Sequence, residues 1–494
     1  MKVLWRPVIG LEIHVQLASL SKIFCSCSTD YIGAEPNTHV CPVCLGLPGA
    51  LPVLNKRVVE LGIRAALALS CTIQNKTVFH RKNYFYPDLP KAYQISQYDL
   101  PLAVGGELFL SSGGGLKRIR ITRLHLEEDA GKLVHSASDG RLEGSDHSFV
   151  DYNRGGVPLA EIVSEPDLSS PAEAREYIAR IRQLVRHLGV SDGDMERGSL
   201  RVDANISMKK TSGDTGEVLL WGERAEIKNM NSLKAVERAL DYEIRRQTNL
   251  LGEGQALFRQ TRHWNDAEGV TTAMRSKEGA DDYRYFPDPD IPPIFIPEAL
   301  TESLRASLPE LPWIREERFR REYALPPADV AILTESLPLT DYFEECVRRG
   351  ASPLRASNWI RTEVLRGVKE KGCSVEAFPV PPGDLAALLM RVEKGEFSTT
   401  VAREVFGSML EGRSLAEGIE TADAASGGFS GSALEDMVRS VLASQPDVAA
   451  EILSGRDTAG KKEKFLAGLV MREARGQADP KEVARLLSLF LKEE

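Results

Sequence analysis

The sequence predicts an α+β protein in which a large sheet-rich region precedes two helical regions. Up to about residue 300, apolar and polar residues alternate with a period of two between turns rich in Gly and Pro, such as residues 105–106 (GG), and this pattern is typical of β-strands. Beyond Pro309 the apolar residues recur at helical spacing, for example in residues 385–392 (LAALLMRV). A stretch of Ala, Ser and Gly interrupts the helical pattern at residues 421–432 and is typical of a linker.

These changes of pattern divide the chain into the domains that we expect. They are a sheet-rich domain over residues 1–300, a helical domain over 301–420, a linker over 421–432 and a small helical tail over 433–494. Three short helices are expected in the tail, and the last of them begins at Asp479 and Pro480, because these residue types favour a helix N-terminus.

The bulk composition is that of a globular protein, with 42% hydrophobic and 27% charged residues over a length of 494, long enough for two to four domains. No apolar stretch approaches the roughly 18 residues that span a membrane, and no signal peptide precedes residues 8–17. We therefore expect the chain in the cytoplasm. The net charge of −9 argues against indiscriminate binding of nucleic acid, so any RNA contact must come from a local basic patch.

Four of the seven cysteines are clustered, as Cys25 and Cys27 followed by Cys41 and Cys44. Two close thiolate pairs separated by a short loop suit a tetrahedral zinc ion, which takes four sulfur ligands in structural sites. Such a site has no open position for a substrate, so the sequence predicts a structural zinc that holds this loop together. The alternative is a set of free cysteines whose spacing is accidental.

Three predicted strands carry polar residues on one face and apolar residues on the other. The polar faces hold Gly10, Glu12, His14 and Gln16 in the first strand, Arg201, Asp203 and Asn205 in the second, and Arg224, Glu226 and Lys228 in the third. A solvated outer face is the simplest interpretation, but such a face usually carries long and flexible side chains. The short Asp, Asn and His side chains favour the floor of a cleft instead.

Two further carboxylates, Glu161 and Glu128, have apolar neighbours in strand-like segments, where an unpaired charge is costly. Together with the residues of the predicted cleft they offer oxygen and nitrogen ligands without thiols, the set that suits magnesium. The alternative is a group of buried ion pairs with Arg154, Arg201 and Lys228. These three cations could also neutralise the charge of a bound phosphate or carboxylate.

Seven segments of the chain resemble the signature blocks of the GatB family, the B subunits of bacterial aspartyl/glutamyl-tRNA(Asn/Gln) amidotransferases. They are residues 8–14 (VIGLEIH), 81–88 (RKNYFYPD), 91–96 (KAYQIS), 125–132 (HLEEDAGK), 161–167 (EIVSEPD), 226–229 (EIKN) and 281–287 (DDYRYFP). Several long blocks in the same order make this resemblance specific.

The resemblance implies a glutamine-synthetase-like cradle, which is a curved antiparallel sheet flanked by helices. It implies a catalytic set of magnesium ligands at Glu12, His14, Glu128, Glu161, Asp203 and Glu226. Lys82 and Lys91 match residues associated with a path for ammonia. The tail is similar to the YqeY-like tails held to contact tRNA, and its basic residues include Lys461, Lys462, Lys464, Arg472 and Arg475.

The activity implied by the resemblance is that of a ligase that forms a carbon–nitrogen bond with glutamine as the amide donor. ATP phosphorylates the side-chain carboxylate of Glu or Asp misacylated onto tRNA(Gln) or tRNA(Asn), and ammonia then displaces the phosphate. An amidase partner (GatA) releases the ammonia, and a small third partner (GatC) completes the heterotrimer. Two alternatives remain open: a non-catalytic protein that binds tRNA and assembles the same complex, and a metallohydrolase that uses the carboxylate–His cluster.

Overall fold

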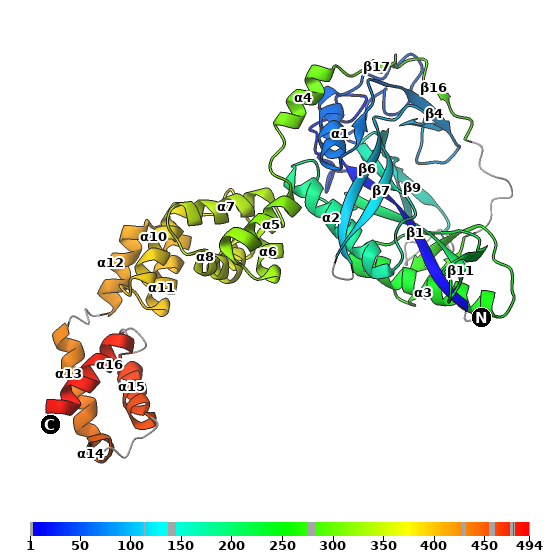
Figure 1. Cartoon of the computed structure of the whole chain (residues 1–494). Coiled ribbons are helices and arrows are strands. Elements are labelled where there is room, and N and C mark those ends of the chain that lie inside the picture. The colour runs from blue at the N-terminus through cyan, green and yellow to red at the C-terminus, as the bar shows by residue number, and fades with distance from the viewer. Residues whose placement is uncertain are drawn as a thin grey trace. The chain divides into compact units, whose positions relative to one another are not determined.

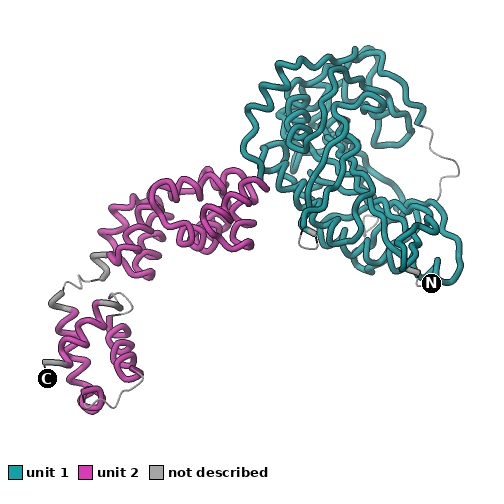
Figure 2. Tube along the Cα trace, in the orientation of Figure 1, with its two compact units in different colours: residues 1–312 teal, residues 313–494 magenta. Residues whose placement is uncertain are grey.

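The computed structural model describes residues 3–112, 115–136, 145–274, 283–426, 431–453, 460–474, 478 and 480–493. The chain divides into two compact units, residues 1–312 and 313–494, shown in different colours in Figure 2. Within the described residues, no helix is long and apolar enough to cross a membrane. The mixed α and β composition predicted from the sequence is confirmed.

A 13-stranded, mostly antiparallel sheet is the centre of unit 1 (Figure 1). Its main path runs in the order β15 (Val270–Ala273), β14 (Gln260–Asn265), β13 (Ala225–Lys228), β11 (Leu200–Ser212), β1 (Val3–Gln16), β10 (Pro158–Ser164), β7 (Gly115–Glu128), β5 (Tyr93–Gln97), β4 (Phe79–Asn83) and β16 (Phe286–Pro287). Three further strands join it: β2 (Thr72–Ile73), β6 (Ala103–Ser112) and β12 (Val218–Trp221). The pairing of β13 with β14 is parallel.

Two small ladders lie outside this sheet. One pairs β3 (Lys76–Thr77) with β17 (Ile294–Phe295), and the other pairs β8 (Lys132–His135) with β9 (Ser148–Asp151). The predicted alternation explains the central strand β1, because Ile9, Leu11, Ile13 and Val15 are all at most 1% exposed. The apolar face of the sheet is therefore the core face, and the polar face is left for a site.

Three helices pack against the strands of this sheet: α1 (Lys56–Ala68), α2 (Pro171–His187) and α3 (Leu233–Gly252). Each begins at a polar residue, respectively Asn55, Ser170 and Ser232, whose side chain accepts a hydrogen bond from a backbone N–H of the first turn. Such caps satisfy donors that the helix itself cannot. The patterns read from the sequence did not predict these helices within the sheet-rich region.

The prediction of a turn at residues 105–106 is wrong, since both glycines lie inside β6. A Cβ atom on Gly106 would lie 2.5 Å from Cys71 Sγ and 2.8 Å from the carbonyl oxygen of Leu69. Glycine is needed there because another part of the chain approaches the strand closely.

The helices after the sheet begin with α4 (Glu298–Ala306), and those of unit 2 enclose two separate hydrophobic cores. The first core includes Phe319, Phe343 and Phe406, and its segment holds α5 (Pro312–Tyr323), α6 (Pro327–Leu333), α7 (Leu337–Arg348), α8 (Pro353–Trp359), the π-helix η1 (Ile360–Val364), α9 (Leu365–Lys371), α10 (Pro382–Glu393), α11 (Thr399–Leu410) and α12 (Leu415–Ser426). The second includes Val438 and Leu487 and is built by α13 (Gly431–Ser444), α14 (Pro446–Leu453), α15 (Lys461–Glu473) and α16 (Pro480–Glu493).

Two expectations about this region need correction. Residues 421–426 of the predicted linker continue α12, and α13 already begins at Gly431; the alanines of this stretch are good helix formers. Residues 427–430 lie outside the described residues, as does Asp479. The described part of the tail holds four helices, one more than the three that were predicted.

Candidate active site and metal centre

The antiparallel registers of β7, β10, β1 and β11 bring polar residues from four strands into rows across the sheet. From β7 to β11, one row consists of His125, Glu161, His14 and Arg201, and the next of Arg123, Val163, Glu12 and Asp203. Residues directly opposite each other in such pairs point to the same face. On the far side of β11, Asn205 lies opposite Glu226 of β13. The predicted polar faces of β1, β11 and β13 therefore meet on one surface.

This surface is the floor of a cleft with a volume of about 340 Å³. Its walls include aromatic and basic side chains from outside the central strands, among them Lys82, Tyr98, Tyr283 and Tyr285. Tyr98 and Tyr285 stack with their ring centroids 4.4 Å apart, and the Lys82 ammonium lies 4.8 Å from the centroid of the Tyr283 ring. The cleft thus combines a charged floor with an aromatic wall.

Two groups of three side chains on the cleft floor can each hold a cation. They are His14, Glu127 and Glu161, and Glu12, Asp203 and Glu226, and the ligand atoms in each group lie within 4.8 Å of one another. Burial, followed by the charges of Glu161, Glu226 and Asp203, raises the pKa of Glu12. The hydrogen bond from Asn205 lowers this pKa, but its effect is smaller than that of the neighbouring carboxylates. A bound divalent cation would relieve the repulsion between these carboxylates, and their oxygen atoms are the ligands that a hard cation prefers.

The first trio is connected to a buried histidine on β7. His14 Nε2 lies 3.6 Å from an oxygen of each of Glu127 and Glu161, and His125 Nε2 lies 2.9 Å from Glu161 Oε2. Burial alone would lower the pKa of His125, but the charges of Glu161 and Glu127 outweigh it and raise this pKa to about 9. The histidines in turn hold the pKa values of both carboxyls below their usual range, although burial opposes this.

The second trio is held by neighbouring donors. Asn205 Nδ2 donates to Glu12 Oε1 at 2.9 Å, and the Lys228 ammonium lies 2.6 Å from Asp203 Oδ2 and 3.0 Å from Glu226 Oε1. Burial would lower the pKa of Lys228, but these two carboxylates raise it above its usual value. Ion pairs with Arg154, Arg201 and Lys228 were considered above as an alternative to metal binding. Lys228 does form such pairs, with Asp203 and Glu226.

Glu128, predicted as a magnesium ligand, does not line the cleft, whereas Glu127, the residue before it, does. In β7 the alternation places His125 and Glu127 on the cleft face, whereas Leu124, Leu126 and Glu128 share the other. Glu128 is 2% exposed and forms an ion pair with Lys91 at 2.7 Å.

Arg154 and Arg201, considered as groups that could neutralise a bound phosphate or carboxylate, both pair with Asp129. The distances are 3.7 Å for Arg154 and 2.6 Å for Arg201, and Arg154 donates in addition to the carbonyl oxygens of Ala130 and Gly131. Neither arginine lines the cleft. Their guanidinium groups balance a carboxylate that is 3% exposed.

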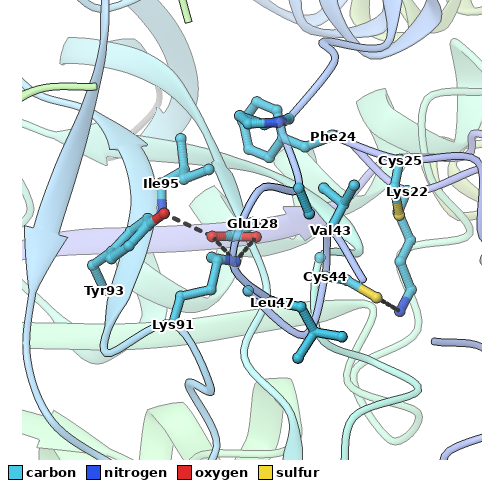
Figure 3. A pocket seen from close by; sticks show the side chains of 14 residues that line it. Lys22, Phe24, Cys25, Val43, Cys44, Leu47, Lys91, Tyr93, Ile95 and Glu128 are labelled. Atoms are coloured by element: carbon cyan, nitrogen blue, oxygen red, sulfur yellow. Dashed lines mark hydrogen bonds and ion pairs between the residues drawn. The ribbon is translucent and has the colours of Figure 1, made fainter. Parts of the chain in front are cut away.

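A second, smaller cavity of about 110 Å³ lies beside the cysteines and contains the Lys91–Glu128 pair, as Figure 3 shows. Glu128 Oε1 also accepts a hydrogen bond from the Ile95 backbone N–H at 2.9 Å. Lys82 and Lys91, both predicted to belong to an ammonia path, therefore line different cavities. Glu127 faces the cleft and Glu128, next to it in the chain, faces the smaller cavity.

The four predicted zinc ligands are close together in space. The sulfur atoms of Cys25, Cys27, Cys41 and Cys44 lie within 4.8 Å of one another, and the Cys41–Cys44 distance is 3.8 Å. A tetrahedral zinc ion with bonds of about 2.3 Å to sulfur places its ligands about 3.8 Å apart. The cluster can therefore hold a structural metal.

A buried lysine completes this cluster. Lys22 is 0% exposed, and its ammonium donates to the His39 carbonyl oxygen at 2.7 Å and lies 3.8 Å from Cys44 Sγ; Figure 3 marks the latter contact. A hydrogen bond from Cys25, with the Cys41 backbone N–H and the Lys22 charge, lowers the pKa of Cys44 to about 4 against the effect of burial. A metal site built of thiolates gains from such a buried cation.

We expect freshly purified protein to contain about one zinc ion per chain, and Cys44→Ser to release it, because a structural site needs all four sulfur ligands. Elemental analysis of protein prepared without chelators measures this. Cys373→Ser, which replaces a partly exposed free thiol outside the cluster, serves as the control and should retain the metal. Wild-type protein without zinc would contradict the site.

The basic residues of the tail lie on and after α15. Lys461, Lys464 and Arg472 are exposed, whereas Lys462 forms an ion pair with Glu451. Arg475 lies outside the described residues.

The sequence interpretation missed the charged residues that β7 contributes to the cleft, which are Glu127, His125 and Arg123. One signal could have identified them. Arg123, His125 and Glu127 alternate with Leu124 and Leu126, the same period of two that identified the polar faces of the other strands.

Comparison with known proteins gives a consistent result over most of the chain. The model of the GatB/GatE catalytic domain matches residues 7–302, and that of the GatB domain matches residues 341–491. Relatives include proteins named as the B subunit of an aspartyl/glutamyl-tRNA(Asn/Gln) amidotransferase. That of Thermoanaerobacter pseudethanolicus is 46% identical and that of Thermomicrobium roseum 47%, each over 490 residues that cover 99% of both chains. That of Carboxydothermus hydrogenoformans is 46% identical over 98% of both chains.

Proposed function

The chain belongs to the GatB family, and from this premise we propose that it is the component of a tRNA-dependent amidotransferase that activates a carboxylate. Its substrates are ATP and a Glu or Asp residue misacylated onto tRNA(Gln) or tRNA(Asn). The observation that carries this proposal is the pair of trios on one cleft floor, His14, Glu127 and Glu161 beside Glu12, Asp203 and Glu226.

Magnesium is the cation that this donor set suits, and when bound it would offset the charge of the ATP phosphates. The chain's own residues hold the site in shape. Asn205 orients Glu12, Lys228 spans Asp203 and Glu226, and His125 fixes Glu161. Positioning of this kind supplies much of the catalysis of phosphoryl transfer, because the protein has little covalent chemistry to perform.

The proposed reaction has two steps. An oxygen of the substrate carboxylate attacks the γ-phosphorus of ATP, and the bond to the β–γ bridging oxygen breaks, so that its electron pair leaves with ADP. The nitrogen of ammonia then attacks the acyl carbon, inorganic phosphate leaves, and a proton is lost from nitrogen to give the amide. The stacked Tyr98 and Tyr285 form a wall that helps to exclude water from the reactive acyl phosphate.

Ammonia must come from another chain, because no amidase signature occurs in this sequence. We propose that a glutaminase partner (GatA) releases it and that a small third partner (GatC) completes the heterotrimer. Lys82 in the cleft and Lys91 in the smaller cavity are proposed to line its path. The mostly antiparallel sheet with helices packed against it supports the proposal that unit 1 is a glutamine-synthetase-like cradle, and the tail is proposed to bind tRNA.

The test uses the complex reconstituted with its partner proteins and supplied with ATP labelled at the γ-phosphate, without glutamine. We expect label to pass to misacylated tRNA, and hydroxylamine to trap the acyl phosphate as a hydroxamate. Uncharged tRNA serves as the control. Amidation by a complex in which no phosphorylated tRNA forms would favour the alternative of a non-catalytic assembly protein, and hydrolysis of an ester or amide without ATP would favour a metallohydrolase.

A further inference from the structure

Arg123 is a cation in the cleft that has no carboxylate partner among the described residues. It lines the cleft from β7, and its one hydrogen-bond contact with a described residue joins Nε to His125 Nδ1 at 3.4 Å. The other basic groups of the chain considered for anion binding are already engaged: Arg154 and Arg201 by Asp129, and Lys228 by Asp203 and Glu226. The guanidinium of Arg123 therefore keeps most of its donors for a ligand.

The sheet register fixes the position of Arg123 relative to the two trios. In its row, Arg123 lies opposite Val163, and Val163 lies opposite Glu12 of the second trio. Two strand spacings separate Arg123 from Glu12, about 10 Å between their backbones. Val163 offers no ligand atom, so the charged residues of this row are Arg123 on one side and the carboxylates Glu12 and Asp203 on the other. His125 connects Arg123 to Glu161 of the first trio.

We propose that Arg123 binds the phosphoryl group that passes from ATP to the substrate carboxylate. This inference rests on the proposed function and names a residue for its central step. A guanidinium presents two parallel N–H groups to two oxygens of a phosphate and remains charged at every physiological pH. The transferred group exposes three oxygens during the reaction, enough to contact Arg123 and the region of the trios at the same time. A carboxylate has only two oxygens, and this favours the phosphoryl group as the ligand.

Arg123 acts when the bond between the γ-phosphorus and the bridging oxygen breaks. Negative charge then spreads over the three oxygens of the transferred group, and a fixed guanidinium stabilises it without reorganisation. ADP lacks this group. Binding of ADP therefore does not depend on Arg123, whereas binding of an ATP analogue does.

The test compares nucleotide affinities in the full-length chain assembled with its partner proteins. Arg123→Gln should weaken binding of a non-hydrolysable imido analogue of ATP roughly 10- to 100-fold in the presence of magnesium, the worth of hydrogen bonds to a charged group. The affinity for ADP should stay within about twofold, because the phosphates of ADP lie outside the contact. Phosphorylation of misacylated tRNA in a single turnover should fall by roughly 100-fold or more.

Two further variants make the result specific. Arg123→Lys keeps the charge and loses the paired donors, so it should restore only part of the rate. Arg118→Gln removes an arginine on the same strand that pairs with Glu107 outside the cleft, and it should leave both affinities unchanged. Thermal unfolding of all three variants shows whether they fold.

Three results would overturn the inference. An equal loss of affinity for ADP and for the analogue would place Arg123 on another phosphate. A higher KM for misacylated tRNA with unchanged affinity for the analogue would place it on the substrate carboxylate. Folded Arg123→Gln protein with wild-type affinities and rate would show that Arg123 has no such role. A wild-type complex that fails to bind the analogue would instead refute the proposed function itself, so the two failures are distinguishable.

Discussion

Replacing Glu161 by Gln should lower the rate of phosphorylation of misacylated tRNA by roughly 100- to 1,000-fold. Glu161 lies within 3.6 Å of both His14 and His125 and belongs to the first trio. The substitution keeps the shape of the side chain but removes its charge. Loss of a cation ligand at a phosphoryl-transfer site forfeits several kcal/mol of transition-state stabilisation, and each 1.4 kcal/mol is a factor of ten in rate.

The measurement is a single-turnover assay with labelled ATP in the reconstituted complex. Glutamine hydrolysis by the glutaminase partner should largely survive, because its nucleophile lies on another chain. Excess magnesium should restore part of the rate by mass action if the variant is folded. A near wild-type rate in Glu161→Gln protein would rule out the first trio as a functional metal site.

The adjacent residues Glu127 and Glu128 provide a matched comparison. Glu127→Gln should reproduce the loss seen with Glu161→Gln, since both side chains belong to the same trio. Glu128→Gln should lower the free energy of unfolding by about 3–5 kcal/mol, because it leaves the Lys91 ammonium, only 8% exposed, without its buried partner. Phosphorylation by the folded fraction should be far less affected. The reverse pattern would restore Glu128 as the ligand.

Much of the cleft could be predicted from strand periodicity alone. Because side chains alternate between the two faces of a strand, the polar face of each of three strands could be identified before any register was known. These faces carry Glu12 and His14 in the first strand, Asp203 in the second and Glu226 in the third. Which strands are neighbours was not predictable in this way, since β1 pairs with β10 and β11, which lie far along the chain. The choice between Glu127 and Glu128 required the same alternation, applied to β7 from Leu124 onward.

The ion-pair partners of the two arginines were also not predictable, because they depend on contacts between residues that are far apart in the sequence. Arg154 and Arg201 could not be assigned to Asp129, because the three residues are distant in the sequence and tertiary packing, not a local pattern, makes them ion-pair partners. Helix α2 is different, since its N-terminus carries a recognisable signal in Ser170, Pro171 and Glu173.

Removal of the tail after Ser426 should raise the KM for misacylated tRNA roughly 10- to 100-fold at physiological salt, with kcat far less changed. Residues 455–475 contain six basic and three acidic residues, a net charge of +3 in a chain whose total is −9. Lys461, Lys464 and Arg472 are exposed and suit contact with phosphates. Each phosphate contact releases counterions, so the loss of several contacts weakens binding by an amount that depends on salt.

The truncated chain should stay folded, because the tail has its own hydrophobic core, which includes Val438 and Leu487 and is separate from the core that precedes it. Kinetics at several salt concentrations separate binding from chemistry, since a lost binding contact raises KM and leaves kcat in place. For wild-type protein log KM should rise more steeply with log salt than for the truncated chain, whose fewer phosphate contacts reduce the slope. A matched full-length variant with Lys461, Lys464 and Arg472 all replaced by Gln should reproduce most of the effect. If KM and its salt dependence are the same in all three proteins, the tail does not hold the tRNA.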